Sequence, residues 1–367
     1  MSVDDEIQKL LDEIDKTPSN KATQGHLGKL KAKLAKLQEE KDLKKRKKSG
    51  TSTISYAVKK TGDATAVLVG FPSVGKSTLI NKITNAESKV AAYEFTTLDI
   101  IPGMLEYNGA KIQILDIPGI IEDASFGKGF GKKVLSVARN ANLILLVIDA
   151  ARKPRLQIEI LKKELHNIGI RMNQKRPDVL IETRPYGGIA LNCMVKLTKI
   201  SEDMIKAIMG EYNIHNADVL VKSDITPEEL IDVLSHNRIY LPLIIVANKV
   251  DAVANLEQAK RDIREECVFI SADKETGLEE LKKRIYENLG IMHIYLKQPG
   301  KPADMKQPLI MKKESTVIDV CAHIHKELVK NFLAARIWGK SVKFGGQQVG
   351  AKHVVLDGDI VEIIMRK

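Results

Sequence analysis

GFPSVGKS, residues 70–77, decides the fold of this chain. The stretch fits the glycine-rich pattern GxxxxGK[ST], and it stands between an apolar run at 65–69 and a helical pattern that begins at Lys76. In such a loop the glycines let backbone N–H groups surround phosphate oxygens, and the helix N-terminus adds positive potential. Lys76 would neutralise the β- and γ-phosphates of a nucleotide, and the Ser77 hydroxyl would ligate Mg²⁺. Because the strand and the helix that the motif requires are both present, we interpret the stretch as a P-loop.

A second phosphate-side pattern lies downstream. Asp116-Ile117-Pro118-Gly119 follows an apolar run at 111–115 and begins 40 residues after Lys76. An aspartate at the carboxyl end of a neighbouring strand can hold Mg²⁺, usually through water, and Gly119 can offer its N–H to a γ-phosphate. The pattern DxPG is weak by itself. Its place after a P-loop makes it a strong indication of a nucleoside triphosphate site.

A third pattern indicates which base is bound. Asn248-Lys249-Val250-Asp251 follows the apolar run at 243–247. A carboxylate at Asp251 can accept hydrogen bonds from both N1–H and the 2-amino group of guanine, whereas adenine offers no such pair of donors. Ser271-Ala272, after the run at 268–270, fits a backbone contact to guanine O6. The order and spacing of the three patterns favour GTP over ATP.

Apolar runs of strand length alternate with helical patterns from residue 65 to residue 290. This alternation predicts the α/β class, with a doubly wound, mainly parallel sheet. Residues 169–240 interrupt it with strand-like and helix-like pieces of their own, which predicts a small inserted α+β domain. After Gly290, a strand, a helix at 316–331 and several short strands predict a compact β-grasp module.

The N-terminal residues predict polar helices. One apolar stripe is formed by Ile7, Leu10, Leu11 and Ile14, and a second by Leu27, Leu30, Leu34 and Leu37. The second stripe recurs at spacings of three and four residues, which is typical of a helical hairpin or a short coiled coil. The segment ends in a basic run at 41–48.

These motifs resemble the DRG (developmentally regulated GTP-binding protein) family of the Obg–DRG group of GTPases. The resemblance rests on GFPSVGKS at 70–77, AAYEFTTLDIIPG at 91–103, DIPGIIEDAS at 116–125, NKVD at 248–251 and HNADVLVKSDIT at 215–226. It implies an N-terminal helical hairpin with a basic end at 1–60 and a G domain at 61–168 and 241–290. It further implies an inserted α+β domain at 169–240 and a TGS domain of β-grasp type at 291–367.

The resemblance also implies the site and the activity. Thr97 would be the switch threonine that ligates Mg²⁺ when the γ-phosphate is present, with Thr96 as the alternative. Lys76, Thr97 and Gly119 are the candidate catalytic residues, and Ser77, Thr97 and Asp116 the candidate Mg²⁺ ligands. The expected nucleotide-binding residues are Gly70, Phe71, Pro72, Ser73, Val74, Gly75, Lys76, Ser77, Thr78, Phe95, Thr96, Thr97, Asp116, Ile117, Pro118, Gly119, Asn248, Lys249, Asp251, Ser271 and Ala272.

Three departures bear on hydrolysis. Ras-like GTPases place a water-orienting glutamine directly after the DxxG glycine, and here that position is Ile120, which cannot polarise water. We therefore expect slow intrinsic hydrolysis that relies on another group, a bound ion or a partner. Some related GTPases use K⁺ held partly by a P-loop asparagine, and the corresponding residue here is Ser73, which leaves K⁺ dependence an open alternative. The segment at 127–133, GKGFGKK, contains no arginine to act as an internal finger.

Charge and composition restrict the partners. The chain has 367 residues, with 58 Lys+Arg against 47 Asp+Glu and a formal net charge of +11, which favours a polyanionic partner. We expect GTP or GDP, the ribosome or ribosomal RNA, and a dedicated protein partner of the kind that the family's eukaryotic members bind. The function predicted is a translation-related switch. A ribosome-assembly factor and a GTP-dependent binding protein with negligible unassisted hydrolysis are the alternatives.

The same features favour a cytoplasmic monomer with no membrane association. Cys193, Cys267 and Cys321 are widely spaced, which is typical of a reducing compartment. The longest apolar stretches, at 141–148 and 241–247, fall far short of the roughly 20 residues that a spanning helix needs. The first ten residues, MSVDDEIQKL, do not fit a secretory signal.

The basic arm generates a test. We expect Lys44, Lys45, Arg46, Lys47 and Lys48 to contact RNA phosphates, with Lys340 and Lys343 as a second patch. Changing the five arm residues to alanine should reduce the slope of log affinity against log salt by several units, since each phosphate contact contributes roughly 0.7–0.9. GTP hydrolysis by the free protein should hardly change. Ribosome or RNA binding measured from low to moderate salt checks this. An unaltered slope would mean that the run only solvates a helix end and that the docking surface lies elsewhere, most plausibly on residues 169–240.

Overall fold

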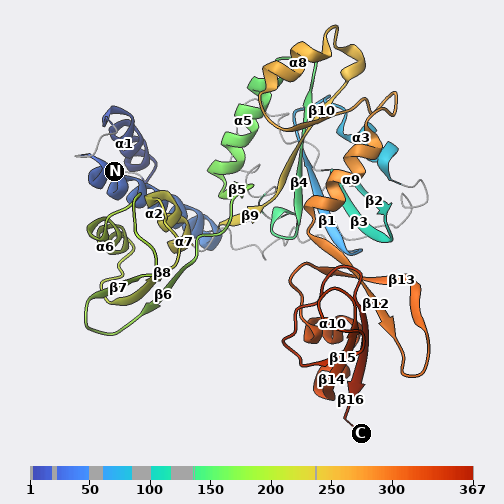
Figure 1. Ribbon diagram of the computed structural model, residues 1–367. Coiled ribbons are helices and arrows are strands. Elements are labelled where there is room, and N and C mark those ends of the chain that lie inside the picture. The colour runs from blue at the N-terminus through green and yellow to red at the C-terminus, as the bar shows by residue number, and fades with distance from the viewer. Residues whose placement is uncertain are drawn as a thin grey trace. The chain divides into compact units, whose positions relative to one another are not determined.

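The computed structural model describes residues 3–18, 23–48, 61–84, 101–116, 135, 137–235 and 238–366 (Figure 1). The candidate switch residues at 95–97 and 117–120, and the segment 127–133, lie outside the described residues. The chain divides into two compact units. One comprises residues 1–55 and 169–240, and the other comprises residues 56–168 and 241–367.

The central sheet of the second unit has six strands in the order β11-β10-β4-β1-β3-β2. Its strands are β1 Ala64–Val69, β2 Ile101–Tyr107, β3 Ala110–Asp116, β4 Leu143–Asp149, β10 Leu243–Asn248 and β11 Cys267–Phe269. All neighbouring pairs are parallel except β2 with β3. Every residue of β1, β4 and β10 is buried, as expected for strands covered on both faces. The predicted doubly wound, mainly parallel sheet is confirmed.

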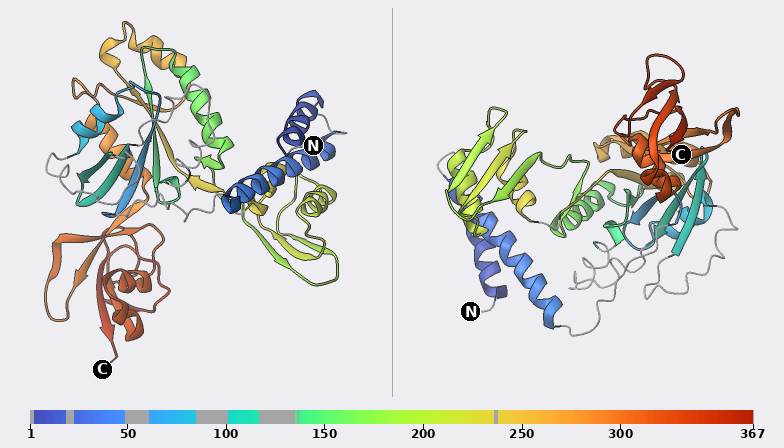
Figure 2. Two further views of the ribbon diagram at one scale, coloured as in Figure 1. Left: turned by 180° about the vertical axis from the view of Figure 1, so that it is seen from behind. Right: turned by 90° about the horizontal axis from the view of Figure 1, so that it is seen from below.

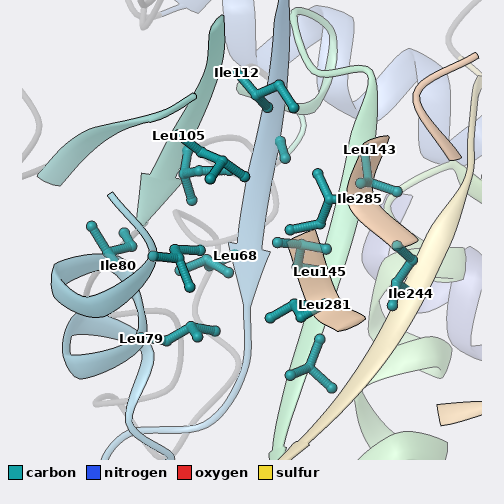
Figure 3. Packing of buried hydrophobic residues seen from close by; sticks show 14 of the residues in the cluster. Leu68, Leu79, Ile80, Leu105, Ile112, Leu143, Leu145, Ile244, Leu281 and Ile285 are labelled. Carbon is teal, nitrogen blue, oxygen red and sulfur yellow. The ribbon is translucent and has the colours of Figure 1, made fainter. Parts of the chain in front are cut away.

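Among the described residues, the helices that accompany this sheet include α3 Lys76–Ile83, α5 Pro154–Asn167, α8 Leu256–Ile263 and α9 Leu278–Asn288, with a short 3-10 turn η2 at Val250–Ala252. Leu79 and Ile80 of α3 and Leu281 and Ile285 of α9 pack against one side of the sheet (Figure 3). Alternate residues of β4 belong to that cluster, namely Leu143, Leu145 and Val147. The intervening side chains therefore face the other side, and α5 contacts β4. Helices therefore pack on both faces of the sheet.

The C-terminal part forms a five-stranded sheet in the order β13-β12-β16-β14-β15. Its elements are β12 Ile291–Lys297, β13 Ala303–Lys312, α10 Val317–Ile324, α11 Lys326–Lys330, β14 Phe332–Trp338, β15 Gln347–Val349 and β16 Ile360–Met365. Strands β12 and β16 pair in parallel, and the other pairs are antiparallel. Cys321 of α10 is fully buried in the core beneath the sheet. This is the β-grasp arrangement that the sequence predicts.

One element differs from the expectation. The sequence predicts a single helix at 316–331, but the backbone is extended at His325, with φ −164°, and α10 and α11 are separate. Thr316 begins α10 with a capping box closed by Asp319. The His325 ring nitrogen accepts a hydrogen bond from the Glu327 N–H at 3.3 Å, so the same residue caps the second helix.

The first unit joins the N-terminal hairpin to the insertion (Figure 2). Its elements are α1 Val3–Lys16, α2 Gln24–Lys48, β5 Ile170–Met172, β6 Val179–Thr183, β7 Ile189–Cys193, α6 Glu202–Glu211, β8 Ala217–Val221, α7 Pro227–Leu234 and β9 Ile239–Leu241. The three-stranded sheet has the order β6-β8-β7, and its buried face packs on α6 and α7. Helix α2 includes the basic run at 44–48, whose side chains lie outside the described residues.

Helix α2 approaches α6 through small residues. Gly28 lies so close that a Cβ there would be 2.4 Å from the Met204 Sδ atom, and Ala32 is fully buried in the core of the insertion. Lys36 Nζ donates to the Glu211 carbonyl at 2.7 Å. Leu27 and Leu30 are buried, and α2 also contacts α1.

Candidate functional site

The P-loop follows β1 and leads into α3, and two of its glycines are required by crowding. A Cβ on Gly70 would lie 2.2 Å from the Val147 carbonyl oxygen of β4. A Cβ on Gly75 would lie 2.4 Å from Asn248 Nδ2, and Gly75 has φ +91°, which side chains rarely tolerate. The loop therefore fits only because glycine stands at both positions.

The Lys76 ammonium lies over this loop. Its Nζ atom donates to the Gly70 and Phe71 carbonyl oxygens, both at 3.0 Å. The positive charge is therefore held at the bend of the loop, where the start of α3 also presents its backbone N–H groups. An anion placed there would meet both.

The Asp116 carboxyl group lies beside the first turn of α3. Ser77 Oγ donates to Asp116 Oδ2 at 3.0 Å, and Asp116 Oδ1 is buried without a hydrogen-bond donor among the described residues. Burial raises the pKa of Asp116, although the Ser77 hydrogen bond and the Lys76 charge oppose the shift. A hydroxyl and a carboxylate with an unsatisfied oxygen are hard oxygen ligands of the kind that Mg²⁺ binds. These two residues fit a Mg²⁺ site.

Asn248, at the end of β10, hydrogen-bonds to the P-loop and to the segment that follows β11. Its Nδ2 donates to the Val74 carbonyl of the P-loop at 2.8 Å, and its Oδ1 accepts from the Ala272 N–H at 2.9 Å. Lys249 Nζ donates to the Ser73 carbonyl at 2.6 Å. The structure thus brings the predicted P-loop, NKVD and Ser271-Ala272 segments together.

The Asp251 side chain is exposed beside this cluster. The Ser271 hydroxyl hydrogen-bonds to it and lowers the pKa of Asp251, so the carboxylate is ionised at neutral pH. An ionised, oriented carboxylate is a double acceptor. It can receive two parallel N–H donors from a flat ring.

Several predicted site residues are not described. Phe95, Thr96 and Thr97 lie outside the described residues, as do Ile117, Pro118 and Gly119. Thr78 is exposed on the first turn of α3, one residue after Ser77. Among the predicted site residues, the structure brings together those of the P-loop, Asp116 and the base-side segments.

One residue at the site was missed by the sequence analysis. Asp149 ends β4 and accepts a hydrogen bond from Lys249 Nζ at 2.9 Å. Its side chain is only 7% exposed. The available signal was an aspartate that closes the apolar run LILLVI, in the way that Asp116 closes the run at 111–115.

Three family models match the chain in succession. Residues 65–184 match the model described as a 50S ribosome-binding GTPase, residues 186–291 match the C-terminal region of the MMR_HSR1 domain, and residues 292–365 match the TGS domain.

Relatives match over almost the whole length. An uncharacterized GTP-binding protein of Methanocaldococcus jannaschii is 50% identical over 100% of this chain and 94% of its own length. Developmentally-regulated G-protein 3 of Arabidopsis thaliana is 44% identical over 98% of both chains. Developmentally-regulated GTP-binding protein 2 of Homo sapiens is 41% identical over 100% of both. The chain belongs to the developmentally regulated GTP-binding protein family. The resemblance found in the motifs, and the predicted P-loop GTPase fold with a TGS domain, are confirmed.

Two negative findings apply to the described part of this family member. None of its helices is both long enough and apolar enough to cross a membrane. Among the described side chains, no group of three or more His, Cys, Asp or Glu residues is arranged to hold a metal ion.

The raised pKa of Asp116 generates a test. A raised native pKa means that ionisation of Asp116 costs stability as pH rises above its unfolded value of about 3.9. Asp116→Asn removes the charge and keeps an acceptor for Ser77. We expect the nucleotide-free variant to be more stable than wild type at neutral pH, with a difference that shrinks below about pH 4. Urea unfolding across pH, without Mg²⁺, measures this. Asp273→Asn, whose carboxylate is 77% exposed, is the control and should match wild type. Equal or lower stability of Asp116→Asn at neutral pH would contradict the assignment.

Proposed function

We propose that this chain binds GTP and GDP, hydrolyses GTP to GDP and phosphate, and changes conformation with the γ-phosphate. The observation that carries the proposal is the meeting of three segments. The P-loop, the Ser77–Asp116 pair and the NKVD segment are joined by direct hydrogen bonds at 2.6–3.0 Å. A phosphate cradle beside an oriented carboxylate fits a guanine nucleotide. The family that the comparisons identify supports the same activity.

In this proposal the P-loop binds the phosphates. Backbone N–H groups of residues 70–77 would surround the phosphate oxygens, and Lys76 would exchange its two carbonyl partners for them. This exchange costs little because the ammonium already lies at the bend of the loop. Ser77 and Asp116 would hold Mg²⁺, Asp116 through water, with Thr97 as the switch ligand. When bound, Mg²⁺ neutralises charge on the phosphate oxygens.

In this proposal Asp251 selects the guanine base. The hydrogen bond from Ser271 orients the carboxylate and keeps it ionised. Guanine presents N1–H and its 2-amino group as two adjacent donors, and the carboxylate can accept both. The Ala272 N–H is already bonded to Asn248 Oδ1, so that loop is held in place before any base arrives. Base recognition would therefore cost little reorganisation.

Hydrolysis by the free protein is proposed to be slow. Ile120 occupies the position of a water-orienting glutamine, and a hydrocarbon side chain cannot orient the attacking water. Gly119 would offer its backbone N–H to the γ-phosphate. A partner, or K⁺ bound near Ser73, would then complete the site. The rival is a GTP-dependent binding protein with negligible hydrolysis when alone.

The ribosome or its RNA is the proposed partner. The net charge of +11 favours a polyanion, and the matching family model is described as a 50S ribosome-binding GTPase. We propose a cytoplasmic, translation-related switch, with a helical hairpin at 1–60, a G domain at 61–168 and 241–290, an insertion at 169–240 and a TGS domain at 291–367. A ribosome-assembly factor is the alternative, and co-sedimentation with mature or immature particles in GTP, GDP and a non-hydrolysable analogue separates the two.

Base choice is tested at Asp251. Asp251→Asn should weaken GTP binding at least about 100-fold, because the amide presents a donor where guanine also has donors. Xanthosine triphosphate, whose ring carries an acceptor in place of the 2-amino group, should bind the variant better than GTP does. Competition titrations with both nucleotides and ATP measure this, with Asp273→Asn as the exposed control. GTP affinity that survives in Asp251→Asn would refute the guanine assignment.

The hydrolytic rate is tested by multiple-turnover assays with and without ribosomes. The isolated protein should turn over at roughly 10⁻⁴–10⁻² s⁻¹, the range of unassisted switch GTPases. Ribosomes should raise the rate if they are the activating partner, and replacing Na⁺ by K⁺ shows whether an ion contributes. A fast rate for the isolated protein in Na⁺ would contradict the role given to Ile120. Ribosome-stimulated binding without turnover would favour the rival function.

A further inference from the structure

Asp149 is a buried carboxylate next to the nucleotide site that the roles above leave unused. It is the last residue of β4 and lies opposite Asn248 in the parallel register of β4 and β10. The Ala150 N–H donates to the Asn248 carbonyl at 2.9 Å, so the two strand ends are joined beside it. Its carboxylate therefore faces the start of the NKVD segment.

The two oxygens of Asp149 have different partners. Oδ1 accepts from the Ala151 N–H at 2.9 Å, which closes a local turn after β4. Oδ2 accepts from Lys249 Nζ at 2.9 Å. The guanidinium of Arg152 lies 4.0 Å from Oδ2 with its side chain 82% exposed, so water screens that contact. Lys249 is the close cation.

Lys249 is held at both ends. Its backbone is left-handed, with φ +64° and ψ +38°, a conformation that is uncommon outside glycine. Its ammonium donates to Asp149 Oδ2 and to the Ser73 carbonyl of the P-loop at 2.6 Å. The side chain thus links the segment that carries Asp251 to the P-loop.

We infer that Asp149 is a positioning residue for guanine-nucleotide binding, acting through the Lys249 ammonium. Its charge holds Lys249 against the Ser73 carbonyl, and this keeps the base-side segment at a fixed distance from the phosphate cradle. The paired ammonium is also kept from competing with Lys76 for the phosphates. The inference rests on the proposed function, because Lys249 is placed at the nucleotide site there.

This role predicts a particular pattern of effects. The contact lies on the base side and does not involve Ser77 or Asp116, so its loss should weaken GTP and GDP equally. It does not read the 2-amino group, so the preference for GTP over inosine triphosphate should not change. The rate of hydrolysis at saturating GTP should also stay the same. A role in loop folding alone would not depend on Lys249.

The test is a double-mutant cycle on GDP and GTP affinity. Asp149→Asn keeps an oxygen for the Ala151 N–H and removes the charge that pairs with Lys249. We expect affinity for both nucleotides to fall about tenfold, with the saturated rate within about twofold of wild type. In a Lys249→Ala background, Asp149→Asn should have no further effect. Asp149→Glu, which keeps the charge on a longer side chain, should recover part of the loss.

Gln157→Ala is the matched control for loop structure. Gln157 bonds both backbone groups of Asp149 and does not contact Lys249, so its effect should be additive with Lys249→Ala. Thermal unfolding of each nucleotide-free variant checks that it is folded before titration.

The outcomes are separable. Unchanged affinity in Asp149→Asn would overturn the inference, and so would an equal loss in the Lys249→Ala background, because Asp149 would then act through the loop. If the wild-type chain bound neither GTP nor GDP, the proposed function itself would fail. Wild-type binding with a Lys249-dependent loss in Asp149→Asn supports both.

Discussion

Complete burial of β1, β4 and β10 is the constraint on which the site depends. These strands are parallel, and apart from Thr65 they are apolar up to their carboxyl ends, where Asp149 closes β4 and Asn248 closes β10. Asp149 and Asn248 end β4 and β10, and Asp116 ends β3, which pairs in parallel with β1; all three residues are buried. Because parallel strands finish at the same edge of the sheet, residues from distant parts of the sequence meet there. The hydrogen bonds among the loops follow from that register.

The two aspartates, Asp116 and Asp149, both end strands of the sheet, but their hydrogen-bond partners differ. Asp149 receives a lysine ammonium and a backbone N–H, so both of its oxygens are satisfied. Asp116 receives one hydroxyl, and its second oxygen has no donor among the described residues. The first arrangement is complete without a ligand and suits positioning. The second carries an uncompensated cost of burial, seen in its raised pKa, which a cation would relieve.

Local patterns predict the P-loop, Asp116 and NKVD segments that the structure brings together. GFPSVGKS and NKVD could be interpreted because each function needs particular residue types within a few positions. Asp116 could be predicted because the pattern DxPG follows an apolar run and begins 40 residues after the P-loop lysine. Asp149 also closes an apolar run, but its role depends on the β4–β10 register and on a lysine 100 residues away, which no local pattern contains. The break at His325 was missed for a related reason: α10 is apolar enough to suggest continuation, and the turn depends on one side chain that caps the next helix.

The sequence pattern did not predict that α2 packs against the insertion, and the physical reason is different. The leucines of α2 recur at helical spacing, and two of them, Leu27 and Leu30, are buried. The face toward α6 consists of Gly28, Ala32 and Ala35, whose value lies in letting two helix backbones approach. Small side chains carry almost no hydrophobic periodicity, so a pattern search passes over them.

Buried ion pairs hold the insertion together at the residues where the chain enters and leaves it. The insertion is entered through β5 and left through β9, which pair with each other, and the buried Asp232 of α7 bonds Arg171 from the first and Arg238 from the segment before the second. A carboxylate between two arginines resists separation, because removing either partner leaves buried charge. After Pro242 the chain begins β10, which ends at Asn248. In the second unit, the end of β10 is likewise held by side chains, because Asn248 and Lys249 donate hydrogen bonds to the Val74 and Ser73 carbonyls of the P-loop. In each unit, therefore, polar side chains at strand ends fix segments that lie far apart in the sequence.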